Sequence, residues 1–201
     1  AGITNVTVVR GVPHECGALG LAIAHVTALQ ECWASPWVDS CLIMEDDFAV
    51  RLPPGNATAL IDSFLRDVQL WDVLMLSCNL QTFANHDARG HWCPPYALRV
   101  MRAMSTAGYA VKRTYAPTIA DAFLGAIEKL KGECGKYFAI DVAWNDIQGK
   151  DVVSRFMTFT ADCTPPTPPG WASHAPPPPP GGRPVLPAPR TGGGALAMAG
   201  R

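Results

Sequence analysis

The chain has 201 residues, of which 48% are hydrophobic, and a formal net charge of -1 at pH 7. This length and apolar content suit one globular domain with a single sizeable core. The near-zero charge gives no electrostatic basis for binding nucleic acid or an anionic membrane, so neither is expected as the main partner. The apolar stretch 17–33 contains His25, Gln30 and Glu31, and we therefore expect no membrane span in this chain.

The first part of the chain alternates strand and helix patterns. Residues 3–9 alternate and are β-branched, which predicts a strand, and 17–34 is apolar nearly all round before Pro36, which predicts a largely buried helix. A strand is expected over 37–44. A helix should follow from an N-cap at Asn56, because its apolar residues recur at spacings of three and four.

The alternation continues beyond residue 70. Residues 71–77 are expected to form a second strand of the continuous apolar type found in parallel sheets, and the polar stretch 79–95 is expected to be a binding loop or lid. The other expected elements are strands over 104–111 and 152–159, a helix from Pro117 to Gly132 and a short helix within 138–148. The pattern predicts a layered α/β domain with a mostly parallel sheet.

The composition changes at Thr164. Twelve of the 19 prolines fall between 165 and 189, and the end is rich in glycine. Such a segment cannot bury enough apolar surface to offset its ordering entropy. We therefore assign 1–163 to the α/β domain and 164–201 to a disordered Pro/Gly-rich tail, with a proline-recognising partner for the tail as an open alternative.

Seven cysteines show no C-x-x-C pair, which argues against a zinc ribbon or a thioredoxin-like site. Several lie in apolar runs and are interpreted as small buried hydrophobes, and the odd number leaves at least one free thiol. His86, His91 and Cys93 lie close together, where a transition-metal site or an ordinary loop would account for them. Sequons at Asn5 and Asn56 fit a secretory lumen but leave the compartment open.

The triplet Glu45-Asp46-Asp47 directly follows the apolar run 41–44. This pattern places carboxylates where a buried strand opens into solvent, which is where open α/β sheets bind ligands. Adjacent negative charges repel unless a cation or a donor-rich ligand lies among them. Oxygen ligands suit Mg²⁺ or Mn²⁺, which commonly bridge carboxylates to phosphate. A solvated acidic turn is the alternative.

Further motifs occur in a fixed order between residues 6 and 159. Gly20 is followed five residues later by His25, and the acidic triplet is followed by W-D-V-L-M-L from Trp71, T-A-G-Y from Thr106 and D-V-A-W from Asp141. This ordered set resembles glycosyltransferase family 25, the lipopolysaccharide-type and procollagen galactosyltransferase-like enzymes. The resemblance implies a GT-A-like, Rossmann-type domain, and a hexosyltransferase that moves a sugar from a UDP-type donor to a glycan or protein hydroxyl with Mn²⁺ or Mg²⁺.

The resemblance also implies roles for the acidic residues. Asp47 and Glu45 are assigned to the metal site, Asp47 by direct contact with the ion and Glu45 through the donor or a metal-bound water. Asp46 projects to the other side of an extended backbone and is assigned to donor binding. Inverting transfer needs a base to take the proton of the acceptor hydroxyl. Asp141 is the candidate because its apolar neighbours would raise its pKa. Capping of the helix that follows is the open alternative for Asp141.

Other residues are expected to line the donor site. His25, Asn79, Thr106 and Trp144 are assigned there, with a hydrogen-bonded core histidine and a core tryptophan as the alternatives for His25 and Trp144. Four basic residues are candidates for steadying phosphate oxygens, or else are solvated surface charges: Arg99, Arg102, Lys112 and Arg113.

The chain departs from the family pattern in ways that bear on activity. Family members begin with an additional strand and helix, after which this chain is expected to start, and Ala24 stands where the family has serine. The Pro-rich tail stands where a Gln and a Ser-Asp-Ile-like segment are expected. A fragment or a degenerate relative is therefore one reading, and a non-catalytic α/β domain that binds carbohydrate or protein is the alternative function. A metal-dependent hydrolase comes third, because no H-x-H or D-x-H cluster is present. The expected compartment is the ER or Golgi lumen for a eukaryotic chain and the cytoplasm for a bacterial one.

Overall fold

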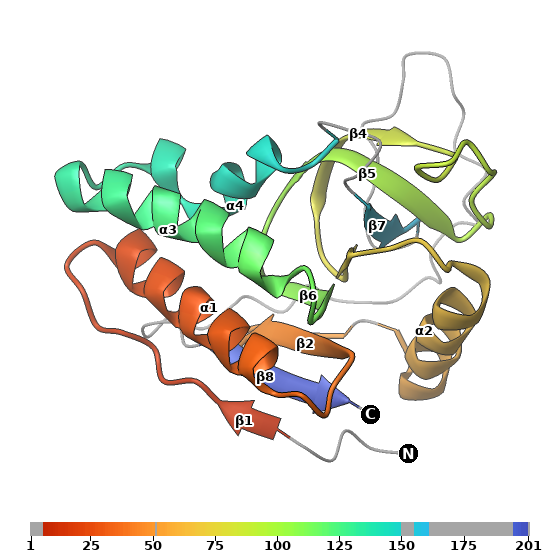
Figure 1. Cartoon of the computed structure of the whole chain (residues 1–201), viewed down its shortest axis with the longest axis horizontal. Coiled ribbons are helices and arrows are strands. Elements are labelled where there is room, and N and C mark those ends of the chain that lie inside the picture. The colour runs from red at the N-terminus through yellow and green to blue at the C-terminus, as the bar shows by residue number, and fades with distance from the viewer. Residues whose placement is uncertain (1–5, 51, 150–154, 161–194, 201) are drawn as a thin grey trace, which may run out of the picture.

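The computed structural model describes residues 6–50, 52–149, 155–160 and 195–200. This part of the chain combines helices with strands that form a sheet, which confirms a mixed α/β architecture (Figure 1). The elements are β1 (Val6–Val8), α1 (Gly17–Ala34), β2 (Ser40–Glu45), α2 (Pro54–Asp67), β3 (Val73–Met75), β4 (Asn79–Ala84), β5 (Ala97–Met104), β6 (Gly108–Lys112), α3 (Ala116–Gly132), α4 (Ile140–Ala143), β7 (Phe156–Phe159) and β8 (Ala195–Gly200), with short 3-10 turns at Lys136–Phe138 and Trp144–Asp146.

The strands form one mixed sheet in the order β1-β8-β2-β6-β3-β7-β5-β4. Among the described strands, β3 and β7 pair in parallel, and the other six neighbouring pairs are antiparallel. The prediction of a mostly parallel sheet is therefore wrong. A continuous apolar run indicates that a strand is buried on both faces, and it carries no information on the direction of the neighbouring strand.

The order of strands brings three chain segments together at one end of the sheet, where β2 and β3 end and β6 begins. We call this end of the sheet the acidic edge. Both β2 and β3 pair antiparallel with β6, which lies between them, so β2 and β3 run in the same direction. Met44 near the end of β2 is level with Gly108 at the start of β6, and Leu76 just after β3 donates its backbone N–H to the Gly108 carbonyl at 2.9 Å. The acidic triplet therefore emerges beside the start of β6 and the end of β3.

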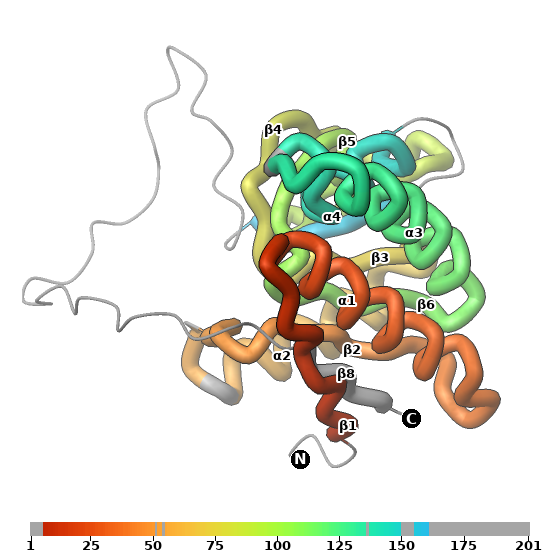
Figure 2. Tube along the Cα trace, turned by 90° about the vertical axis from the view of Figure 1, so that its left-hand side faces the viewer, coloured from red at the N-terminus to blue at the C-terminus, as the bar shows by residue number. Residues whose placement is uncertain are grey.

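Helices cover the two faces of the sheet unequally. Figures 1 and 2 show α1 and α3 side by side, and the two helices contact each other. Val73 and Met75 of β3 belong to the main core under these helices, whereas Leu74 joins a second cluster around Phe64 and Trp71 next to α2. This alternation along β3 follows from the opposite directions of successive side chains in a strand.

Two helix predictions are confirmed and one start is shifted. The helices expected over 17–34 and up to Gly132 are α1 and α3. The helix expected from an N-cap at Asn56 begins instead at Pro54, with Pro53 as its N-cap residue. Proline suits the first turn because its missing N–H would be unpaired there in any case.

Residues 79–95 differ from the expected loop. Asn79–Ala84 is β4, which pairs antiparallel with β5, and an isolated bridge joins His86 to Trp92 within the connection. The segment is thus largely a β-hairpin. Its sequence resembles a loop because β4 is an edge strand that is mostly exposed, and its side chains are accordingly polar.

The C-terminal prediction falls mainly outside the described residues, which exclude 161–194 and 201. Residues 195–200 of the expected tail form β8, which pairs with β1 on one side and with β2 on the other. This differs from disorder throughout 164–201. The six residues Ala-Leu-Ala-Met-Ala-Gly have no proline, so their backbone groups can all enter the hydrogen-bonded ladder.

Disulfide bonds correct the interpretation of the cysteines as buried hydrophobes. Cys16 at the start of α1 is bonded to Cys134 after α3, with their Cα atoms 5.7 Å apart, and Cys32 near the end of α1 is bonded to Cys41 in β2, with a Cα separation of 5.9 Å. The pairing depends on these distances in space, which residue spacing does not provide. Cys93 is free, which agrees with the expected unpaired thiol.

Candidate functional site

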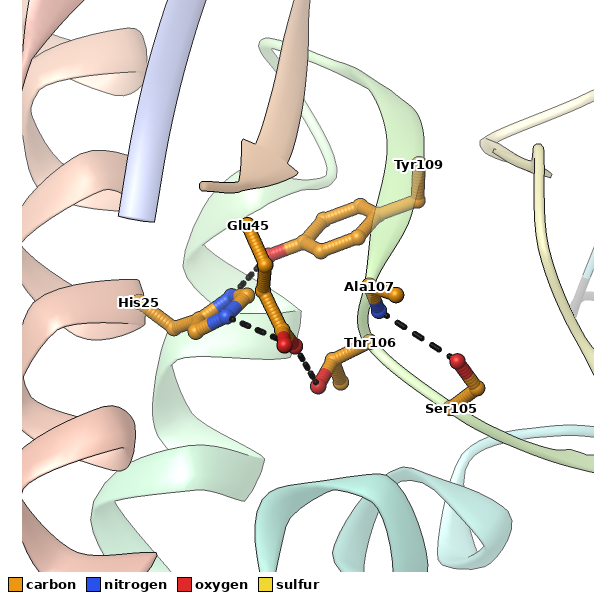
Figure 3. Close-up of polar contacts among 6 residues, drawn as sticks. All are labelled: His25, Glu45, Ser105, Thr106, Ala107 and Tyr109. Atoms are coloured by element: carbon orange, nitrogen blue, oxygen red, sulfur yellow. Dashed lines mark hydrogen bonds and ion pairs between the residues drawn. The ribbon is translucent and has the colours of Figure 1, made fainter. Parts of the chain in front are cut away.

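Glu45, the last residue of β2, lies where the acidic strand meets the segment before β6. Its backbone N–H donates to the Ala107 carbonyl at 2.8 Å, and its Oε1 accepts a hydrogen bond from the Thr106 hydroxyl at 3.0 Å. Nε2 of His25 lies 3.7 Å from the same carboxylate oxygen (Figure 3). The Glu45 side chain is only 21% exposed. One carboxylate of the triplet therefore interacts with the protein interior.

His25 reaches this carboxylate from the middle of α1. The residue is completely buried, and its Nδ1 lies 3.1 Å from the Tyr109 hydroxyl. Its Nε2 has no hydrogen-bond partner among the described residues. Leaving a buried polar atom unpaired costs free energy. His25 was assigned to the donor site, and in the structure it reaches that region through Glu45 from the inside.

Gly20 allows the segment before α1 to pack closely against this helix. A Cβ atom at this position would lie 2.2 Å from the backbone carbonyl oxygen of Val12. No side chain fits there unless the backbone of the preceding segment moves, so the glycine and the histidine five residues later serve different purposes. Gly20 admits the segment that precedes α1, and His25 places an imidazole behind β2.

The connection from β5 to β6 is tight and strained. Ser105 has a positive φ of 93°, and its hydroxyl oxygen accepts a hydrogen bond from the Ala107 backbone N–H at 3.3 Å. At Gly108 a Cβ atom would lie 2.5 Å from the ring of Phe48, which follows the acidic triplet. Non-glycine residues with positive φ cost free energy and occur often at functional sites. This connection presents Thr106 to Glu45.

Tyr109 is the completely buried tyrosine behind the site. Burial raises the pKa of its hydroxyl, and the negative charge of Glu45 raises it further. Its ring stacks on His25 with centroids 5.9 Å apart and contacts Trp144 edge-on at 5.4 Å. The phenol therefore stays protonated at neutral pH and can donate a hydrogen bond.

Asp141 lies in the first turn of α4 and is partly buried. Burial raises the pKa of its carboxyl group, the charge of Glu45 raises it further, and hydrogen bonds from the backbone N–H groups of Asp141 and Val142 partly lower it. The expected direction of the shift is therefore present. The alternative of a capping residue is not met, because the N-cap residue of α4 is Ala139 and Asp141 lies within the first turn.

The rest of the acidic triplet faces solvent. Asp46 and Asp47 are both exposed, and Asn79, also exposed, pairs with Met104 just before the strained connection. Within the described ranges, no group of three or more His, Cys, Asp or Glu side chains is arranged to hold a metal ion. The oxygen donors of Glu45 and Asp47 fit Mg²⁺ or Mn²⁺, because such ions are commonly held by one or two carboxylates together with substrate phosphates and water.

Trp144 cannot stack on a sugar in this structure. It is 0% exposed and contacts the rings of Tyr109, Phe123 and Phe156. The prediction of a ligand-stacking role is therefore wrong, and the alternative of a core tryptophan is correct. Its motif, D-V-A-W, combines a partly exposed acid with a residue that anchors α4 to the core.

Two of the four basic residues, Lys112 and Arg113, lie away from the acidic edge. Lys112 ends β6 level with Ser40, at the opposite end of β2 from Glu45, and its ammonium lies 5.2 Å from the centroid of the Trp71 ring. Arg113, the next residue, donates its backbone N–H to the Asp39 carbonyl. Neither residue can contact a phosphate beside the triplet, because both lie at the opposite end of the strands from the acidic edge. Arg99 is buried in β5, whereas Arg102 is exposed.

A cavity of about 440 Å³ lies between the end of α2 and the β4–β5 connection. Asp87 organises the connection by accepting hydrogen bonds from the backbone N–H groups of Arg89 and His91. His86, His91 and Cys93 form no metal-binding group in the described part of the chain. The cavity is lined by Asp67, Val68, Gln69, Leu70, Asp87, Arg89, His91, Trp92, Cys93 and Pro94.

Comparisons with known proteins leave the family open. No family model matches the chain, and neither a curated protein nor a solved structure is significantly similar to it. None of the helices in the described ranges is both long and apolar enough to cross a bilayer.

Sequence reasoning missed two residues of the site. Tyr109 was noted only as part of the T-A-G-Y motif, although its hydroxyl contacts His25. Ser105, which adopts the positive φ, was given no role. A tyrosine within an otherwise small and apolar strand was the available signal, because buried tyrosines usually need a hydrogen-bond partner. Nothing in the sequence around Ser105 marks the strain.

Proposed function

We propose that this chain is a metal-dependent glycosyltransferase of the family 25 type with a GT-A-like domain. The reaction would move a hexose from a nucleotide diphosphate donor, of which a UDP-sugar is the expected kind, to a hydroxyl of a glycan or protein. The observation that carries the proposal is the buried pair of Tyr109 and His25 behind Glu45. A solvated acidic turn needs no support from the core, whereas a carboxylate that must hold a fixed orientation does.

The acidic edge supplies the groups that such a reaction needs. Glu45 and Asp47 would hold Mn²⁺ or Mg²⁺, which when bound neutralises charge on the diphosphate leaving group. Asp46 and Asn79 are exposed near this edge and are assigned to the donor. The acidic motif lies at the carboxyl end of its strand, the position at which α/β sheets commonly bind ligands.

Asp141 is proposed as the base. In an inverting transfer the acceptor oxygen forms a bond to the anomeric carbon, the bond from that carbon to the diphosphate breaks, and the hydroxyl proton passes to the carboxylate. The raised pKa of Asp141 favours proton uptake, since a carboxylate of ordinary pKa is a weak base at neutral pH. Its electrostatic coupling to Glu45 supports a position near the donor.

A thermal-shift experiment with UDP and Mn²⁺ tests the proposal. A ligand at about one hundred times its Kd stabilises the folded state by about 2.7 kcal/mol, which for a chain of this size raises Tm by roughly 5–10 °C. The shift should need both components. Asp47→Asn should abolish it, whereas Asp121→Asn on the exposed side of α3 should leave it intact. An unchanged shift in Asp47→Asn would refute the metal role.

Transfer itself is tested by the release of UDP from UDP-sugars. Asp141→Asn should retain the Mn²⁺-dependent shift while losing turnover, because the amide cannot accept the proton. General-base catalysis contributes about 10²- to 10⁴-fold, and the loss should lie in that range. Binding of UDP and Mn²⁺ without turnover by the wild type would indicate a degenerate transferase.

The alternative is a non-catalytic domain that binds carbohydrate. One observation favours it: Trp92 is 82% exposed at the rim of the cavity beside Arg89 and His91. Exposed aromatic rings stack on sugar faces, and charged side chains bind their hydroxyls. This alternative predicts glycan binding that Trp92→Ala removes, with no effect of UDP or Mn²⁺. The proposed partner of the Pro-rich tail belongs to the same alternative.

A further inference from the structure

The imidazole of His25 lies between two oxygen atoms. The Tyr109 hydroxyl is 3.1 Å from Nδ1, and Oε1 of Glu45 is 3.7 Å from Nε2 (Figure 3). A neutral imidazole carries one proton, so one ring nitrogen donates and the other accepts. The position of that proton decides whether Glu45 faces an N–H group or a nitrogen lone pair.

Only one of the two neutral tautomers both pairs the Tyr109 phenol and avoids repulsion between Nε2 and Glu45. With the proton on Nδ1, the imidazole would donate to the Tyr109 oxygen, and the phenolic proton would have no acceptor among the described residues. The lone pair of Nε2 would then face a carboxylate. With the proton on Nε2, the phenol donates to Nδ1 and the N–H bond points toward Glu45. The second arrangement pairs the phenol and turns the Nε2 contact from repulsion into attraction.

We propose that Tyr109 and His25 are positioning residues for Glu45: the phenol fixes the His25 proton on Nε2, and the resulting N–H dipole turns the carboxylate toward the interior. Thr106 donates to the same oxygen at 3.0 Å. Two groups from different elements, α1 and the β5–β6 connection, therefore hold one oxygen of Glu45. Residues that orient a metal-binding carboxylate in this way typically affect metal affinity 10- to 100-fold.

A purely structural role for His25 fits the geometry less well. A core histidine usually pairs both ring nitrogens, but Nε2 has no hydrogen-bond partner in the described part of the chain. A distance of 3.7 Å is longer than a hydrogen bond, so the contact to Glu45 acts as a dipole facing a charge.

The tautomer can be measured without any ligand. Heteronuclear NMR of the full chain labelled with ¹⁵N distinguishes a protonated Nε2 from a protonated Nδ1, and His25→Asn assigns the signal among the five histidines. We expect the Nε2–H form in the wild type. Tyr109→Phe should shift the population toward Nδ1–H, because Nδ1 loses its donor. Tyr115→Phe, whose ring packs edge-on against Phe156, is the matched control and should leave the signal unchanged.

The positioning role is measured by the affinity for UDP in the presence of Mn²⁺. Tyr109→Phe should weaken binding about 10- to 100-fold, and Tyr115→Phe should not. This part rests on the proposed function, whereas the tautomer does not. A wild-type signal from Nδ1–H, or equal affinity in Tyr109→Phe and the wild type, overturns the inference. If Tyr109→Phe does not fold, the wild-type tautomer still decides. An Nε2–H tautomer without UDP binding by the wild type refutes the proposed function and leaves the tautomer assignment standing.

Discussion

Substitution of Gly20 by alanine should destabilise the protein, against the intrinsic preference of helices. Alanine is favoured over glycine in a helix interior by about 1 kcal/mol. At Gly20, however, the new Cβ atom would lie 2.2 Å from the Val12 carbonyl oxygen, and the obstacle is backbone rather than a flexible side chain. Overpacking of this kind typically costs about 1–3 kcal/mol, and more where backbone must move. We therefore expect a net loss of about 1–2 kcal/mol.

Gly125 provides the matched control for this prediction. It lies within α3, and a Cβ atom there would meet nothing within 4 Å. Gly125→Ala should therefore stabilise the protein by about 0.5–1 kcal/mol through the same helix preference that Gly20→Ala gains. Urea unfolding followed by circular dichroism measures both variants from the shift in midpoint at constant slope. Equal stabilisation by the two substitutions would refute the close approach of residues 12 and 20.

Three other outcomes follow from the structure. Replacing Cys16 and Cys134 by serine should cost about 5 kcal/mol in urea unfolding, against about 2.6 kcal/mol for the Cys32–Cys41 pair, because the separations are 118 and 9 residues; the reverse order would contradict the entropic account. Ser105→Ala should be less stable than Ser105→Gly by about 1 kcal/mol, since both lose the hydroxyl and only glycine relieves the positive φ; equal stability would argue against the strain. Asp141 has a raised pKa when folded, so the wild type loses stability relative to Asp141→Asn as pH rises above about 4, the ordinary pKa of aspartate; a stability difference that is constant between pH 3 and pH 7 would exclude the shift.

The sequence predicted best those features that depend on local spacing. The periodicity and end signals of α1 and α3 lie within each segment, and the acidic triplet marked the end of β2 because the change from apolar to charged is abrupt. Strand direction is a property of two distant segments, and so the antiparallel β6 between β2 and β3 could not be read from either. The exposed β4 resembled a loop for a related reason, because pairing with β5 makes it a strand and this pairing is not visible in its own sequence.

The site shows a similar division. His25, Glu45 and Thr106 were each singled out, and the structure joins them through one carboxylate oxygen. Their connection through Tyr109 was not predicted, because a hydrogen bond between residues 84 positions apart leaves no trace in spacing. Trp144 was assigned by its chemistry, which is the same in a core as in a binding site. Only its burial distinguishes the two.

The disulfide between Cys32 and Cys41 and the contact between His25 and Glu45 both join α1 to β2. Helix α1 and strand β2 are covalently joined at one end of their shared stretch, and they meet through His25 and Glu45 at the other. Glutathione and thioredoxin keep cysteine pairs reduced in most cytosols. In protein prepared from a reducing cytoplasm, the position of Glu45 relative to α1 would therefore be less firmly fixed than in protein from an oxidising compartment. The choice of expression host becomes part of any measurement of ligand affinity.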